Sequence, residues 1–190
     1  MVHKNVDLKD LFLLDKDVTF LNHGSFGSCP TPIFKEFQRY QKLLEFQPIS
    51  FLDQHIDQNI LSAQKALSAF INCDADDIVF FTNPTTAINE VMRSIPLNKG
   101  DEILSSTHEY GALDKAWDFI SKKRNAIHIK AAIPNPILSK EEFIDAFISA
   151  ITSRTKVIFI SHITSSTGLI FPIKEIVKMA RQQNILTIID

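Results

Sequence analysis

The feature that most constrains this chain is an alternation of short apolar runs with amphipathic segments, which begins near residue 77 and continues to residue 190. Several runs, such as Val157–Ser161, are continuously apolar without a period of two, as is typical of strands buried on both faces. The alternation therefore predicts an α/β fold of three layers, with a mostly parallel sheet covered by helices on both faces. The predicted strands are residues 77–82, 102–105, 126–129, 157–161 and 185–189, and the predicted helices begin at 85 and span 112–123, 140–151 and 173–183.

Two further helices are predicted ahead of the first strand. Apolar residues recur at three- and four-residue steps in residues 33–46, and a second such run spans about 51–71. We therefore divide the chain into an N-terminal segment with helices, residues 1–72, and an α/β part, residues 73–190. The proline-rich stretch 131–137 is predicted to be a surface loop, because the alternation resumes directly after it.

The composition argues against several classes of protein. The formal net charge is −2, and no cluster of lysine and arginine interleaved with aromatic residues marks a path for nucleic acid. No run approaches the ~20 apolar residues of a membrane span, and the charged residues 1–10 lack the apolar stretch of a signal peptide. We expect a cytoplasmic protein that binds neither a membrane nor nucleic acid. Cys29 and Cys73 have no second ligand at metal-binding spacing, so neither a metal site nor a disulfide is predicted.

The segment Phe81–Asn89 is a candidate anion site, because it lies where a predicted strand gives way to a predicted helix. The hydroxyls of Thr85 and Thr86, with free backbone N–H groups at a helix N-terminus, would suit a phosphate. The alternative is an ordinary threonine N-cap, which the local pattern alone favours. Neither the P-loop nor the Gly-x-Gly-x-x-Gly pattern occurs, which disfavours a dinucleotide-binding domain.

Two other loops follow predicted strands at the same sheet edge. Ser106–Ala112 carries His108 and Tyr110, either of which could stack on a flat cofactor. The second loop, which ends at Gly168, offers the hydrogen-bonding residues His162, Thr164, Ser165, Ser166 and Thr167. Each of the two loops, taken singly, is compatible with an ordinary surface turn.

Polar residues end four successive predicted strands, and core packing does not require this recurrence. Ligands of parallel α/β sheets gather at the carboxyl ends of the strands. The pattern therefore indicates a cofactor site at this edge. The four strand-end residues are Thr82, Ser105, Ser161 and Asp190.

Four segments that occur in order, together with Asp190, carry a family resemblance. The chain resembles the class V aminotransferase superfamily, a group of fold type I pyridoxal-phosphate enzymes, and is most similar to its isopenicillin N epimerase-like branch. The likeness covers nearly the whole chain and implies that residues 73–190 are the N-terminal part of the cofactor-binding large domain. The segments are Phe20–Pro30, Asn83–Asn89, His108–Ala112 and Ser161–Gly168.

The resemblance implies a role for each candidate residue around pyridoxal 5′-phosphate. Thr85 and Thr86 would hold the phosphate, and Tyr110, or less favourably His108, would stack on the ring. Asp190 would pair with the ring nitrogen and keep it protonated. The residues expected to be catalytic are Asp190, Tyr110 and His108. Ser165 falls at a position where relatives often have an Asn that hydrogen-bonds the ring hydroxyl of the cofactor. In this chain, Thr164 or His162 could make that contact instead. The family's substrate segment matches Asn22, His23 and Gly24.

The resemblance also implies a reaction at the α-carbon of a small amino acid, of the aminotransferase, epimerase or lyase type. In such enzymes the Schiff-base lysine and a small C-terminal domain follow the position of Asp190, and the active form is a homodimer. We therefore expect this chain to be a fragment that lacks that lysine. The alternative is a catalytically silent truncated protein, or half of a split enzyme, that acts only by association.

Overall fold

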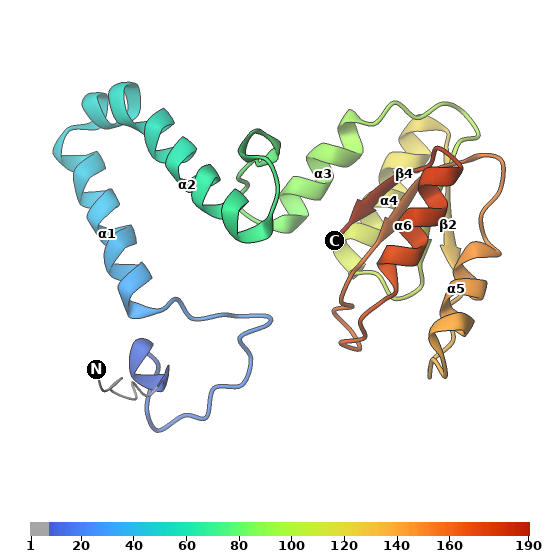
Figure 1. Ribbon diagram of the computed structural model, residues 1–190, viewed down its shortest axis with the longest axis horizontal. Helices are drawn as coiled ribbons and strands as arrows, with labels where there is room; N and C mark the ends of the chain where they lie inside the picture. The colour runs from blue at the N-terminus through green and yellow to red at the C-terminus, as the bar shows by residue number, and fades with distance from the viewer. Residues whose placement is uncertain (1–7) are drawn as a thin grey trace. The chain divides into compact units, whose positions relative to one another are not determined.

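The structure, a computed structural model, describes residues 8–190. The chain divides into two units, residues 1–79 and 80–190 (Figure 1). Within residues 8–190, no helix is both long enough and apolar enough to cross a membrane.

The first unit contains helices joined by a long loop, residues 12–30, and no strand within residues 8–79. It confirms both predicted N-terminal helices, although the second begins with a π-helical turn, and α2 ends where Asn72 takes a left-handed conformation with φ of +57°. Neither α1 nor α2 contains a buried residue. The elements are η1 (Leu8–Leu11), α1 (Thr31–Phe46), η2 (Ser50–His55), α2 (Ile56–Ile71) and η3 (Ala75–Asp77).

The second unit is a four-stranded sheet alternating with helices. All three strand pairs are parallel and the strand order is β2-β1-β3-β4, which confirms the predicted parallel sheet. The strands are β1 (Glu102–Ser106), β2 (Ile127–Ala131), β3 (Thr155–Ile160) and β4 (Leu186–Ile189). The helices are α3 (Pro84–Ser94), α4 (Gly111–Arg124), α5 (Lys140–Ile148) and α6 (Ile173–Gln182).

Helices cover both faces of this sheet, as the sequence predicts. On one face Ile103 and Phe159 pack with Trp117 of α4 and Met92 of α3. The other face belongs to α5 and α6, whose Phe147 and Ile176 share a second apolar cluster with residues of β1 and β3. Figure 1 shows α6 and α4 on opposite sides of the strands. These two clusters hold the carboxyl ends of the strands in one row.

The predicted strand at residues 77–82 is wrong. A short 3-10 turn occupies Ala75–Asp77, and residues 78–81 belong to no helix and pair with no strand of the described chain. Phe80 and Phe81 are about half exposed. An apolar run becomes a strand only where a neighbouring strand accepts its backbone hydrogen bonds, and this run has no such neighbour within residues 8–190. Thr82 is consequently not the end of a strand.

Candidate functional site

The carboxyl ends of β1, β3 and β4 meet at one edge of the sheet, as parallel strands must. The backbone pairing of β3 and β4 continues beyond the strands proper. The N–H of Asp190 donates to the carbonyl of Ile160 at 3.1 Å, and the N–H of His162 donates to the carbonyl of Asp190 at 2.8 Å. Asp190 is therefore fixed at this edge through its backbone.

The carboxyl group of Asp190 has no hydrogen-bond or ionic partner in the part of the chain that the structure describes. Partial removal of water by the surrounding protein raises the pKa of this carboxyl. A carboxylate in such a place gains from any positively charged N–H donor that a ligand brings to it.

The first turn of α3 supplies two free hydroxyls. Asn83 is the N-cap, and its Oδ1 accepts the N–H of Thr86 at 2.8 Å. The cap is thus an asparagine, which overturns the alternative of an ordinary threonine cap. Across residues 8–190, no hydrogen-bond partner is found for the side-chain hydroxyl of Thr85 or Thr86. Both hydroxyls remain available to an anion.

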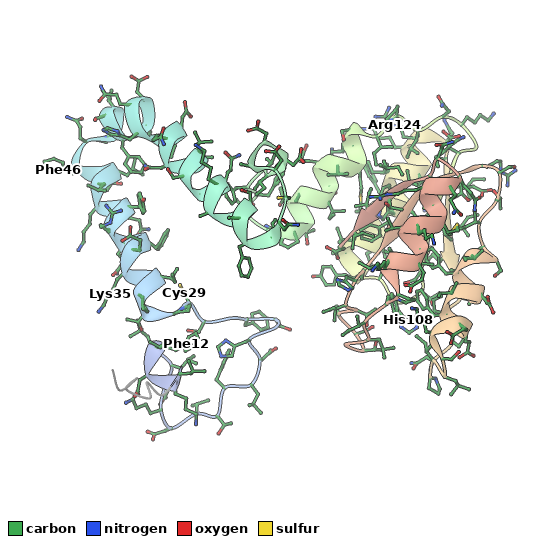
Figure 2. The ribbon with its side chains drawn as sticks, viewed as in Figure 1. Phe12, Cys29, Lys35, Phe46, His108 and Arg124 are labelled. Atoms are coloured by element: carbon green, nitrogen blue, oxygen red, sulfur yellow. The ribbon has the colours of Figure 1, made fainter. Side chains whose placement is uncertain are left out.

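Contacts at the far end of α3 show which way this helix runs. Arg124, the last residue of α4, donates to the carbonyl of Arg93 in the last turn of α3. His108, just before α4, and Arg124 lie at opposite ends of this unit (Figure 2). Helix α3 therefore runs alongside α4, and its amino end with Thr85 points toward the carboxyl edge of the sheet.

The loop after β1 separates its two aromatic candidates. His108 is 9% exposed, and its ring meets that of Phe171 edge-on at 5.9 Å. Its Nδ1 is buried without a partner among the described residues. Tyr110 is 46% exposed, so Tyr110 and not His108 offers an open ring face.

The loop after β3 is organised around Thr164. The Thr164 hydroxyl contacts that of Thr167 at 2.5 Å and accepts the N–H of Leu169 at 3.2 Å. Gly168 allows this turn because its φ is +67°, in the left-handed region. The Thr164 side chain is therefore used within the loop, whereas His162 and Ser165 are exposed.

Sequence reasoning missed Glu109, whose carboxylate accepts three hydrogen bonds. Its Oε1 accepts the Ser106 hydroxyl at 2.6 Å. Its Oε2 accepts the hydroxyl and the N–H of Ser161 at 2.6 and 3.0 Å. Burial raises the pKa of the Glu109 carboxyl, although these donors oppose the shift. Ser106 and Glu109 lie three residues apart in one loop, and this short spacing is a local signal for the first contact.

The predicted substrate residues belong to the first unit. The Oδ1 of Asn22 accepts the N–H of Ser25 at 3.3 Å. The ring of His23 contacts those of Phe12 and Phe20, with centroid distances of 5.4 and 4.7 Å. A substrate-binding role for Asn22, His23 and Gly24 stays a prediction.

Comparison with known proteins gives consistent relatives. The profile of the aminotransferase class-V family matches residues 30–190. Isopenicillin N epimerase of Amycolatopsis lactamdurans is 31% identical over 180 residues, which are 93% of this chain and 45% of that protein. A probable chloroplastic L-cysteine desulfhydrase of Arabidopsis thaliana is 28% identical over 185 residues, covering 90% of this chain and 39% of that protein. The chain thus spans less than half the length of these relatives.

Solved structures agree on the fold. A C-DES mutant with glycine covalently linked to its PLP cofactor superposes with a TM-score of 0.85 at 23% identity, covering 92% of this chain and 47% of that one. The cysteine desulfurase CsdA of Escherichia coli gives a TM-score of 0.77 at 19% identity, with 95% and 47% covered. At these identities the likeness concerns the fold alone.

Proposed function

The chain belongs to the aminotransferase class-V family, and on that premise we propose that it forms part of a pyridoxal-phosphate-dependent enzyme that acts at the α-carbon of a small amino acid. The observation that carries the proposal is a set of polar groups without internal partners within residues 8–190. They are the hydroxyls of Thr85 and Thr86 at the amino end of α3, and the Asp190 carboxyl.

These groups fit the two ends of pyridoxal phosphate. An anionic phosphate suits free hydroxyls at the positive end of a helix. A protonated ring nitrogen suits the Asp190 carboxylate, which is exposed and has no hydrogen-bond or ionic partner among the described residues. The two hydroxyl donors and the carboxylate acceptor therefore suit the cofactor in both charge and hydrogen bonding.

Other residues of this edge would orient the cofactor. Tyr110 would stack on the ring, since its side chain is exposed whereas that of His108 is packed against Phe171. His162 or Ser165 would contact the ring hydroxyl, because the Thr164 hydroxyl is already used within its loop. When bound, the cofactor would supply an electron-poor ring that stabilises negative charge at the substrate α-carbon. Asp190 would hold the proton on the ring nitrogen.

The reaction is proposed only as a class. The relatives are described as an isopenicillin N epimerase and as L-cysteine desulfhydrases, so proton return and loss of a sulfur group are both represented among them. The lysine that would bind the cofactor covalently is proposed to lie in the part of the relatives that this chain does not span. A cytoplasmic location and a homodimer remain proposals, the dimer supported by exposed apolar residues such as Phe37 and Phe46 on α1.

A cofactor titration tests this function. Absorbance and fluorescence of the purified chain are followed as pyridoxal phosphate is added, with pyridoxal as the ligand that lacks the phosphate. The double variant Thr85→Val/Thr86→Val should weaken pyridoxal phosphate binding at least roughly tenfold, because hydrogen bonds to a charged group are lost. Its effect on pyridoxal should be small.

The second arm addresses the ring nitrogen. Asp190→Asn should weaken binding of both ligands, whereas the matched control Asp57→Asn on the exposed surface of α2 should change neither. A wild-type chain that does not bind pyridoxal phosphate, or threonine variants that bind it unchanged, would contradict the proposal.

A further inference from the structure

The carboxylate of Glu109 joins the ends of two neighbouring strands. One oxygen accepts the hydroxyl of Ser106, the last residue of β1. The other accepts both donors of Ser161, the residue directly after β3. Ser106 and Ser161 are 1% and 3% exposed, so water cannot readily replace these contacts.

Glu109, which carries this carboxylate, is joined through its backbone to Tyr110. Tyr110 follows Glu109 directly, and its carbonyl accepts the N–H groups of Leu113 and Asp114 in the first turn of α4, both at 3.0 Å. The backbone of Tyr110 is thus held by α4 in one direction and by the anchored Glu109 in the other. The Tyr110 side chain remains exposed and has no hydrogen bond to any described residue.

The carboxylate is also connected with Asp190, through Ser161. Ser161 lies between Ile160 and His162, and these two residues hold the backbone of Asp190 through its N–H and its carbonyl. A shift of Ser161 would therefore move Asp190. One carboxylate thus connects the residue proposed to stack on the cofactor ring with the residue proposed to pair with its nitrogen.

We propose that Glu109 is a positioning residue that sets the spacing between the backbones of Tyr110 and Asp190, and thereby the gap in which the pyridoxal ring is held. This inference rests on the proposed function. A partly buried carboxylate is a costly way to join two strands, since an apolar pair would do so without desolvating a charge. The cost is understandable where the geometry of a site depends on it.

The experiment compares Glu109→Ala and Glu109→Gln with wild type. The alanine variant removes every acceptor and leaves the donors of Ser161 unsatisfied. In the glutamine variant the side-chain oxygen can still accept from Ser161, and the side-chain N–H₂ can donate to the Ser106 hydroxyl. Glu90→Ala is the matched control, because Glu90 is exposed on α3 and its side chain makes no hydrogen bond or ion pair with a described residue.

Two measurements are made on each variant. Without cofactor, amide hydrogen exchange should quicken at Ser161 and His162 in the alanine variant and stay near the wild-type rate in the glutamine variant. With pyridoxal phosphate, the alanine variant should bind roughly tenfold more weakly and lose the visible circular dichroism of a fixed ring. The glutamine variant should keep both the wild-type amide exchange and the wild-type cofactor binding. If Glu109 acted only through its charge, the glutamine variant would lose them as the alanine variant does.

The outcomes separate this inference from the function on which it rests. If wild type binds the cofactor and the alanine variant binds it equally well, the positioning role is overturned and the proposed function stands. Unchanged exchange at Ser161 and His162 in the alanine variant overturns the role in the same way. If wild type does not bind the cofactor, the proposed function fails, and the role of Glu109 fails with it.

Discussion

Among single residues, His128 of β2 combines full burial of its ring with ionisable neighbours. Its Nδ1 lies 2.7 Å from Oδ1 of Asp118, and its Nε2 lies 2.8 Å from the hydroxyl of Ser105. This order of groups resembles a Ser-His-Asp triad, but Ser105 is 0% exposed and no substrate could reach it. Lys130 of β2 forms ion pairs with Asp118 and Asp114 of α4. Together with the contacts of His128, these ion pairs link β1, β2 and α4.

This cluster predicts a loss of stability in mild acid. Burial lowers the pKa of His128 below its ordinary value of 6.5, although Asp118 opposes the shift. The unfolded chain therefore binds a proton at a higher pH than the folded chain does. Stability contributed by neutral His128 is present above about pH 6.5 and is lost as the pH falls through the folded pKa, by at most about 1.4 kcal/mol per pH unit.

The measurement is the difference in free energy of unfolding between wild type and His128→Gln, taken from urea melts between pH 7.5 and 5.5. Glutamine can hydrogen-bond but cannot titrate, and the other ionisable groups largely cancel in the difference. The advantage of wild type should shrink on acidification. A difference that stays constant, or that grows in acid, would contradict the assignment of neutral His128.

At the level of elements, the start of α3 depends on a side chain that the sequence pattern alone did not single out. Asn83→Ala removes the side-chain oxygen that accepts the N–H of Thr86 and should lower the free energy of unfolding by about 1 kcal/mol. Asn83→Ser keeps a capping oxygen and is the matched control. Urea denaturation measures both variants, and an alanine variant as stable as the serine variant would show that the cap contributes nothing.

Elements also show how far a sequence can be interpreted. Strands β1, β3 and β4 could be predicted because continuous apolar runs and intervening helices are local patterns. The run at residues 77–82 has the same local pattern, but pairing depends on a partner strand that no local pattern reports. Glu109 was missed for a related reason. Its link to Ser106 is local, whereas its link to Ser161 exists only after β1 and β3 have paired.

The whole molecule combines two units that differ in how much surface they bury. In residues 80–190, strands β1 and β3 contain side chains with essentially no exposure, such as Ile103 and Ile158. In residues 8–79, helices α1 and α2 bury no side chain completely, and isolated helices of this length are marginal in water. Local stability should therefore differ sharply between the units.

Hydrogen exchange of the dilute chain tests this difference. Amides of β1 and β3 should be protected at least roughly 100-fold more than those of α1 and α2, because the strands open only when the apolar clusters on both faces separate. Equal protection would contradict the prediction and would mean that something covers the apolar side chains of α1 and α2. If that protection fell on further dilution, the cover would be a second copy of the chain, as the proposed homodimer requires. Protection independent of concentration would instead place the cover within one chain.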